Sequence, residues 1–370
     1  MKWVTLGETA MPDIAALVRE RLENGSEFKV DHDPADIGNS ILRQLKEKRG
    51  EHKKGLSSLR LSASGSCIRR LAYDFHGVEP DGFKTTSSST LIFGTGDATE
   101  GLLVTALLEA IADVDGISLE ATGADQQRIH VKVPLRGDLS DALGKPWAGV
   151  PIPGHPDGQG VVPVWDKGDD EPHLEPFILE VKSMSDYAFS KFRKEGIPFY
   201  ESNGVPNGYA FQSQAYQLAK RQEGIPVRWT YLIAYGKSVG AKDAMVFSDA
   251  PPKSRRWHED DPDQWANLYP VIGAWIPRND EVQAEIISRY QQVLLSEGPD
   301  DFDRPHGPKR DTGHPGTKNK YKGAKRSRLT FPCDWCPHLF NCWPEAFTYA
   351  QTYGFYKELC SIHTAVPKED

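Results

Sequence analysis

No long hydrophobic run occurs in the 370 residues of this chain. The best apolar stretch, 101–114, carries Glu109 and Asp113 and is shorter than the ~18–20 residues that a membrane span needs. The first residues also lack the apolar segment of a signal peptide. We therefore expect a globular cytoplasmic protein without a membrane partner, whose 38% hydrophobic residues form one or two cores.

Cysteine is scarce, with five residues in the whole chain. Three of them, Cys333, Cys336 and Cys342, nevertheless fall within ten residues of the segment FPCDWCPHLFNCW, 331–343. In a reducing compartment such a group favours a metal over a disulfide. A tetrahedral zinc site needs a fourth ligand, and within this segment His338 could supply it.

An excess of basic charge is also missing, because the net charge is −8. This argues against a protein that coats nucleic acid without specificity. The stretch 309–328 is an exception, with eight Lys and Arg residues against the single acid Asp311. It is either a binding strip for a polyanion or a solvated, flexible linker, and its charge alone favours neither interpretation.

Apolar periodicity predicts an α/β fold in which helices flank a mixed central sheet on both sides. Helical spacing at 11–23 and 36–49 predicts an N-terminal helical cap, and 169–176 reads as a hairpin connection between two strands. The predicted strands are 127–135, 158–165, 176–184 and 227–237, and the other predicted helices are 66–77, 90–113, 185–195, 208–223 and 281–298.

The basic stretch separates this core from the cysteine-rich end of the chain. We therefore predict three parts. These are an N-terminal helical region over 1–60, a core over 61–300, and a basic linker with the cysteine-rich segment over 301–370.

Two carboxylates and a lysine form the sharpest candidate site. In an extended strand Glu180 and Lys182 point to the same face, and the predicted hairpin would bring Asp157 beside them. Such a set suits a hard divalent ion, held by both carboxylates and the carbonyl of Val181, with Lys182 orienting a water. The alternative is a surface Glu–Lys pair with an unrelated turn aspartate, since an isolated E-x-K is common.

Two further features bear on this choice. Gln212 and Tyr216 are four residues apart, on one face of a predicted helix, and could reach the metal site or a phosphate. They would equally suit an ordinary amphipathic helix. Glu100, on the predicted long helix, could add a third carboxylate, with Asp97 as its substitute.

The order Asp157, Glu180-Val-Lys182, Gln212-xxx-Tyr216 resembles the PD-(D/E)XK nuclease superfamily. The Q-x-x-x-Y after the lysine is similar to the signature of its RecB-type exonuclease branch. Some members of this branch, among them AddB-type, CRISPR-adaptation and phage exonucleases, carry an iron–sulfur cluster. These members have one cysteine before the core and a C-x2-C-x5-C group after it.

The cysteines of this chain resemble that arrangement. SGSCIRRL supplies Cys67, and Cys333, Cys336 and Cys342 have the C-x2-C-x5-C spacing. The resemblance covers roughly residues 65–345. Two positions depart from the pattern: Ile68 replaces a proline, and Glu100 stands where the branch commonly has histidine.

This resemblance implies a restriction-endonuclease-like core closed by a [4Fe–4S] cluster on the four cysteines. It implies a DNA exonuclease, dependent on Mg²⁺ or Mn²⁺, that hydrolyses phosphodiester bonds of single strands or DNA ends in a bacterial or phage-infected cell. Asp157, Glu180 and the Val181 carbonyl, with Glu100, would bind the metal. Lys182, Gln212 and Tyr216 would complete the catalytic site.

DNA is the implied partner, gripped by 309–328 and by Lys191, Arg193 and Lys194. The sequence has no G-x-x-x-x-G-K-[ST] motif, so a helicase or recombination protein would have to unwind the duplex. Two alternatives stay open. One is a non-catalytic module that binds DNA ends or a helicase, and the other is an endonuclease or a spacer-processing CRISPR nuclease.

Overall fold

The computed structural model describes residues 2–23, 54–81, 103–121, 128–135, 149–201, 204–236, 271–303, 309–310, 326–328, 336–342 and 364–365. The chain divides into two compact units. Unit 1 comprises 1–49, 60–65 and 89–291, and unit 2 comprises 50–59, 66–88 and 292–370. These boundaries differ from the predicted three parts, because 66–88 group with the C-terminal residues.

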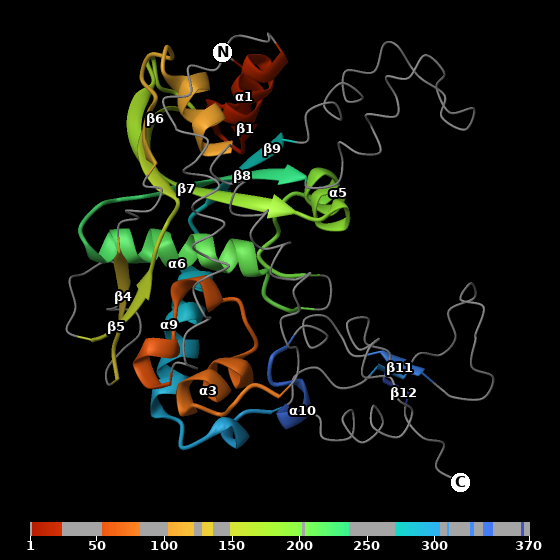
Figure 1. Cartoon of the computed structure of the whole chain (residues 1–370). Helices are drawn as coiled ribbons and strands as arrows, with labels where there is room; N and C mark the ends of the chain where they lie inside the picture. The colour runs from red at the N-terminus through yellow and green to blue at the C-terminus, as the bar shows by residue number, and fades with distance from the viewer. Residues whose placement is uncertain are drawn as a thin grey trace, which may run out of the picture. The chain divides into compact units, whose positions relative to one another are not determined.

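Unit 1 is built on a curved mixed sheet with the strand order β1-β2-β6-β7-β8-β9, in which β3 also pairs with β6 (Figure 1). β6 and β7 form the predicted antiparallel hairpin, β7 and β8 are parallel, and β9 is antiparallel to β8. The parallel pair requires a crossover connection, which contains α5 and α6. The elements are β1 (Trp3–Leu6), β2 (Thr9–Pro12), β3 (Ser118–Ala121), β6 (Gly158–Asp166), β7 (His173–Met184), α5 (Asp186–Glu195), α6 (Gly208–Gln222), β8 (Trp229–Gly236) and β9 (Val271–Pro277).

Alternate residues of β7 face two separate cores. Leu179 and Val181 pack on one face of the sheet, with α1 (Ile14–Glu23) and a helix over 103–111. Met184 packs on the other face, with side chains of α5. The sequence prediction of helices on both sides of a mixed sheet is therefore confirmed in the described part of unit 1.

The predicted N-terminal helical cap is wrong for the first residues of the chain. β1 and β2 form an antiparallel hairpin, and β2 pairs with the end of β6, so this segment extends the central sheet. Each strand has four residues, which is too short for alternation to stand out against the helical spacing of 11–23. The predicted helix at 36–49 lies outside the described residues.

Helix α6 is largely buried and packs against the sheet and against a second, two-stranded sheet of β4 (Ile129–Val133) and β5 (Val150–Gly154). The side-chain amide of Gln222 joins α6 to β4. Its Oε1 accepts from the backbone N–H of Lys132 at 2.7 Å, and its Nε2 donates to the carbonyl of Lys132 at 3.2 Å. The predicted strand at 127–135 is thus present, but outside the central sheet.

Unit 2 contains α3 (Ile68–His76), which ends at Gly77 as the sequence predicts. Gly77 has a φ of +71°, a left-handed conformation that glycine adopts without steric cost. Helix α9 (Asp280–Leu295) passes from unit 1 into unit 2, and none of the described helices is long and apolar enough to cross a membrane. Unit 2 also contains η1 (Gly55–Ser58), η6 (Pro299–Asp301), β10 (Lys309–Arg310), β11 (Arg326–Arg328), α10 (Leu339–Cys342) and β12 (Thr364–Ala365), and η2 (Leu61–Ala63) belongs to unit 1.

Candidate functional site

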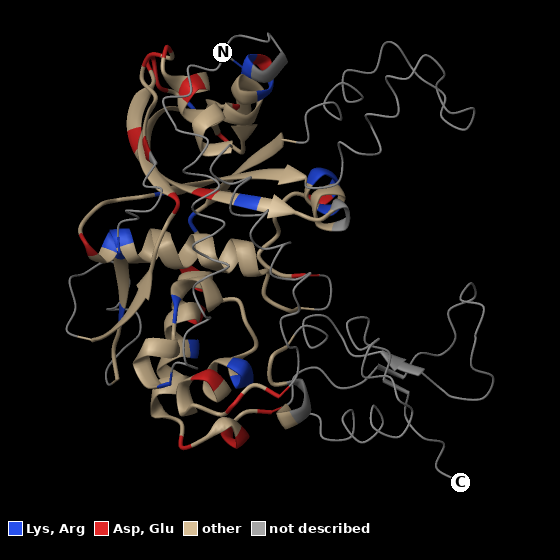
Figure 2. Ribbon diagram, in the orientation of Figure 1, with Lys and Arg blue, Asp and Glu red and all other residues tan. Residues whose placement is uncertain are grey.

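The candidate site begins on β7, where a charged pair interrupts an apolar strand. Glu180 is fully buried and Lys182 is 22% exposed, and the Lys182 ammonium contacts Oε1 of Glu180. Their neighbours Leu179 and Val181 belong to the core on the opposite face of the sheet. In Figure 2 acidic and basic positions follow one another along β7, in strands that are otherwise mostly uncharged. A fully buried carboxylate requires such a partner, because transfer of an isolated charge from water is very costly.

Asp157 reaches β7 through the β6–β7 hairpin. It directly precedes β6, whose first residue pairs with Leu179. The carboxylate Oδ2 of Asp157 accepts a hydrogen bond of 2.7 Å from the backbone N–H of Val181. This contact places Asp157 next to the chain segment that carries Glu180 and Lys182.

Helix α6 closes the site from the side of the sheet that Glu180 faces. Nε2 of Gln212 donates to Oε1 of Glu180 at 2.7 Å and to the Tyr216 hydroxyl at 2.9 Å. The Tyr216 hydroxyl in turn donates to the carbonyl of His155 at 3.1 Å. Burial, together with the nearby charge of Glu180, raises the pKa of Tyr216, so this hydroxyl keeps its proton.

Hydrogen bonds and backbone contacts therefore link five predicted site residues in unit 1, namely Asp157, Glu180, Lys182, Gln212 and Tyr216. Asn207 caps the first turn of α6, accepting from the N–H groups of Tyr209 and Ala210 at 3.1 and 3.3 Å.

Other glutamines of α6 hold the fold. Nε2 of Gln214 donates to the carbonyl of Pro277 at 2.8 Å, and Nε2 of Gln217 donates to Thr230 and to Ile276 at 3.0 and 3.1 Å. Both side chains are fully buried and attach α6 to β8 and β9. The glutamine-rich sequence of this helix thus serves two purposes, and Gln212 is distinguished by its bond to Glu180.

Sequence reasoning missed Tyr209, which lies close enough to Lys182 and Glu180 to interact with their charges. Burial is the main cause that raises its pKa. Its spacing of three and seven residues from Gln212 and Tyr216 puts all three on one helix face, and this was a usable signal.

Several predicted residues lie elsewhere or outside the described part. Glu100 and its substitute Asp97 fall outside the described residues, and so does most of 309–328. Lys191 lies on α5 and forms an ion pair with Glu201. The carbonyl of Val181 stays a predicted metal ligand.

The cysteines belong to unit 2. Cys67 is the N-cap of α3, and the segment 336–342 is attached to α3 and the residues that follow it. Three contacts hold it: the N–H of Asp81 donates to the Pro337 carbonyl at 3.0 Å, Asn341 donates to the Glu79 carbonyl at 2.9 Å, and His338 meets Asp74 at 2.9 Å.

Cys336 is close enough to Cys67 and Cys342 for their charges to affect it, whereas Cys333 lies outside the described residues. Burial raises the pKa of Cys336 to about 11, although a hydrogen bond from the backbone of His338 and the charge of Arg70 oppose this shift. Cys67, Cys336 and Cys342 thus all belong to unit 2, but they are not among the described groups whose ligand atoms lie within 4.8 Å of one another.

The residues around Cys67 also have a purely structural role. Arg69 is buried and donates to the carbonyl of Phe302 and the carboxylate of Asp300, and it lies over the ring of Tyr73. His338 is fully buried and stacks on Tyr73 with a centroid distance of 5.0 Å. Arg69 of the C-I-R-R sequence therefore connects α3 to residues 300 and 302 of unit 2.

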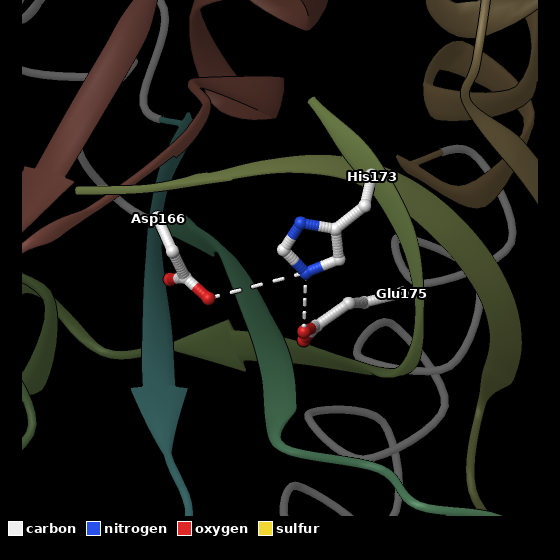
Figure 3. Close-up of side chains that lie close together, drawn as sticks. All are labelled: Asp166, His173 and Glu175. Carbon is white, nitrogen blue, oxygen red and sulfur yellow. Dashed lines mark hydrogen bonds and ion pairs between the residues drawn. The ribbon is translucent and has the colours of Figure 1, made fainter. Parts of the chain in front are cut away.

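A second group of possible metal ligands lies where β6 ends and β7 begins. One ligand atom from each of Asp166, His173 and Glu175 lies within 4.8 Å of the others, and the His173 ring lies between the two carboxylates (Figure 3). Nε2 of His173 is 2.9 Å from Glu175, and its Nδ1 is 3.2 Å from Asp169. The sequence analysis does not predict this group, because 169–176, which contains His173 and Glu175, has the pattern of a hairpin connection.

This second group could hold a divalent ion, but Arg228 already pairs with both of its carboxylates. Arg228 donates to Glu175 at 2.9 Å through Nε and to Asp166 at 3.0 Å through Nη2. The bond to Glu175 is the main cause that raises the pKa of His173. To bind here, a metal ion would have to displace Arg228 from the carboxylates and the proton from His173, whose raised pKa favours the protonated ring. The arrangement therefore fits an ion-pair network better than a metal site.

No protein-family model and no curated protein matches the chain. Among solved structures, an alkaline exonuclease from Laribacter hongkongensis is similar at 14% identity, over 66% of this chain and 88% of that chain, with a TM-score of 0.31. What the fold and the described side chains define is an α/β protein with a buried carboxylate–lysine network on its central sheet.

Proposed function

We propose that the chain is a metal-dependent DNA exonuclease that hydrolyses phosphodiester bonds of single strands or strand ends. The observation that supports this most is the network in which Asp157, Glu180, Lys182 and Gln212 meet in unit 1. Two carboxylates and a lysine on one strand pair suit hydrolysis at a phosphate, since they provide oxygen ligands for a metal ion and a positive charge. The resemblance to the RecB-type nucleases, on these same residues, supplies the substrate.

The donor set suits a hard divalent ion. Asp157 and Glu180 offer carboxylate oxygens, and the carbonyl of Val181 would be a third oxygen ligand. When bound there, Mg²⁺ or Mn²⁺ would lower the pKa of a ligated water and offset negative charge that develops on the phosphate. Glu100, if it completes the set, would add a further carboxylate.

The protein residues would divide the remaining tasks. Lys182 would orient the attacking water and place its positive charge beside the phosphate. Gln212 would keep Glu180 in position through its 2.7 Å bond. Tyr216 would hold the chain before Asp157 by its bond to His155, which lies two residues upstream. Each of these roles requires a fixed geometry, which the burial of Gln212 and Tyr216 favours.

The test is degradation of an end-labelled linear single strand with Mn²⁺, by the parent protein and by Lys182→Ala. We expect the parent to release short products and Lys182→Ala to lose at least ~100-fold in rate, the size of effect typical of one charge-stabilising group. Lys167→Ala is the matched control, because Lys167 is 72% exposed and pairs with Glu8 on another part of unit 1.

Equal degradation by Lys182→Ala and the parent would disprove this site. Failure of the parent to degrade DNA while still binding its ends would favour the non-catalytic module, and cleavage of a closed circle would favour an endonuclease.

We further propose that Cys67, Cys333, Cys336 and Cys342 bind a [4Fe–4S] cluster. The support is the C-x2-C-x5-C spacing and the attachment of the segment 336–342 to α3 and the residues after it, since α3 begins directly after Cys67. Such a cluster would stabilise unit 2, because it would join Cys67 to residues far along the chain. The alternative zinc site would use His338, whose Nε2 already contacts Asp74 at 2.9 Å.

Colour and metal content distinguish these two cofactors. A brown protein with broad absorbance near ~400 nm and bound iron would support the cluster. A colourless protein with one zinc per chain would support the His338 alternative. Cys67→Ser should lose the cofactor as completely as Cys333→Ser does, whereas a zinc site confined to 333–342 would survive Cys67→Ser. The proposed helicase or recombination partner would be tested for binding to the protein that carries its metal cofactor.

A further inference from the structure

A row of basic side chains lies on the outer face of the β4–β5 sheet in unit 1. Alternate residues of β4 are buried, in the order buried, half-buried, buried, half-buried, buried. Arg128, His130 and Lys132 therefore share the opposite, outward face. On β5, Pro153 and Pro151 lie beside His130 and Lys132 and carry no charge. This face of the sheet is thus basic along the whole of β4.

The row continues toward the candidate catalytic site through His155. His155 follows β5 directly and is exposed, and its carbonyl accepts the 3.1 Å hydrogen bond from Tyr216. Asp157, whose carboxylate is bound to the Val181 N–H, comes two residues later. The same short segment therefore carries the last basic residue of the row and the first carboxylate of the site.

Arg128, His155 and Lys132 lie close enough to His130 for their charges to act on it. Burial lowers the pKa of His130, and the charges of Arg128, His155 and Lys132 lower it further, while the acid Glu223 acts in the opposite direction. A lowered pKa favours the neutral imidazole of His130, so Arg128 and Lys132 carry the fixed positive charge of the row. Two fixed cations on one face of a chain of net charge −8 form a local site for an anionic ligand.

The dimensions fit a nucleic-acid strand. Residues two apart on a strand are separated by ~6.6 Å, so Arg128 to Lys132 spans ~13 Å. One strand of B-form DNA carries a phosphate every ~3.4 Å along the helix axis. The row is therefore long enough to contact several consecutive phosphates of one strand.

We propose that Arg128, His130, Lys132 and His155 form a phosphate-binding track that leads the substrate strand to Asp157 and Glu180. This inference rests on the proposed function, and it names the surface that receives the DNA. The sequence analysis assigns DNA binding to the basic residues of α5 and of 309–328. The phosphate-binding track on β4 does not depend on them.

Binding of a fluorescently labelled single-stranded oligonucleotide, measured by anisotropy in EDTA, tests the track without catalysis. Each phosphate contact with single-stranded DNA contributes about 0.7 to the slope of log K against log salt concentration. Arg128→Gln with Lys132→Gln should therefore reduce the slope by ~1.4 and weaken binding at low salt. Lys167→Gln removes a basic residue elsewhere in unit 1 and should leave the slope unchanged, and Arg128→Gln alone serves if the double variant does not fold.

The outcomes separate the track from the proposed activity. A reduced slope in the double variant, with normal binding by Lys182→Ala, supports the track even if the parent protein degrades no DNA. An unchanged slope and affinity in the double variant overturns the track, even if the parent protein proves to be an active exonuclease.

Discussion

Lys182→Met tests whether the ion pair on β7 substitutes for a bound metal. The substitution keeps a side chain of similar length and removes the positive charge next to Glu180, which is fully buried. Breaking a buried ion pair costs ~3–5 kcal/mol, and the lower end applies here because Lys182 is 22% exposed and Gln212 still donates to Glu180. We therefore expect the variant to be ~3 kcal/mol less stable than the parent in EDTA.

Thermal unfolding followed by circular dichroism measures this effect. For a domain of ~150–250 residues, 1 kcal/mol corresponds to ~2–4 °C, so the midpoint should fall by ~6–12 °C. Mn²⁺ at 100 times its dissociation constant would stabilise the folded state by ~2.7 kcal/mol and recover most of the loss. Activity should not return, since the water-orienting amine is absent. Lys167→Met, whose ion pair with Glu8 is exposed, should change stability by less than ~1 kcal/mol.

Two results would refute this reasoning. The first is a Lys182→Met variant that melts with the parent in EDTA, because the buried Glu180 would then need no cation. The second is a melting temperature of the variant that does not respond to Mn²⁺, because Asp157 and Glu180 would then not bind the ion. A metal-induced shift that is greater in the variant than in the parent would agree with competition between Lys182 and the metal for Glu180.

Three further predictions concern other residues of unit 1. Gln212→Leu should destabilise the fold by ~1.5–3 kcal/mol, because it removes a bond to the charged Glu180, and Gln217→Leu by ~0.5–1.5 kcal/mol for each of its bonds to neutral groups. In a Mn²⁺ titration only Gln212→Leu should bind the metal more weakly than the parent. Equal metal affinities of the two variants would contradict the different roles given to these two glutamines of α6. His173→Gln should destabilise more at about pH 6 than at about pH 9 in urea unfolding, because a raised histidine pKa contributes stability below the ordinary value near 6.5 that is lost as the pH rises through the folded-state value, and an effect that grows with pH would show the opposite sign. Gly154→Ala should cost ~1–3 kcal/mol and lower activity, since its Cβ would lie 2.7 Å from Cε1 of the Tyr216 ring, and full activity with unchanged melting would show that the ring can move freely.

The local parts of the site could be predicted from the sequence. The two-residue period of a strand places Glu180 and Lys182 on one face, and the four-residue spacing of a helix does the same for Gln212 and Tyr216. The hairpin that brings Asp157 to β7 follows from two adjacent strand patterns and the turn between them. These are short-range relations, and the structure agrees with them.

Local sequence patterns could not predict contacts between residues that are far apart in the chain. β9 was not predicted, and β1 and β2 were placed in a helical cap, because their partners in the sheet lie far away in sequence. Arg228 meets Asp166 across 62 residues, and Arg69 meets the Phe302 carbonyl across 233. No periodicity within one segment records such contacts, which depend on the packing of whole elements.

By itself, the sequence determined the α/β class, the hairpin of β6 and β7, and the faces on which the acid, lysine, glutamine and tyrosine side chains lie. Those properties depend on the local geometry of strands and helices, which a few residues encode. Only the tertiary structure decided that Gln212, and not Gln214 or Gln217, bonds to Glu180. It also decided that Tyr216 bonds to the carbonyl of His155 and that β4 pairs with β5, the strand that precedes His155 and Asp157. The physical reason is that these contacts form only when α6 packs between two separate sheets, and that packing is a property of the whole folded unit.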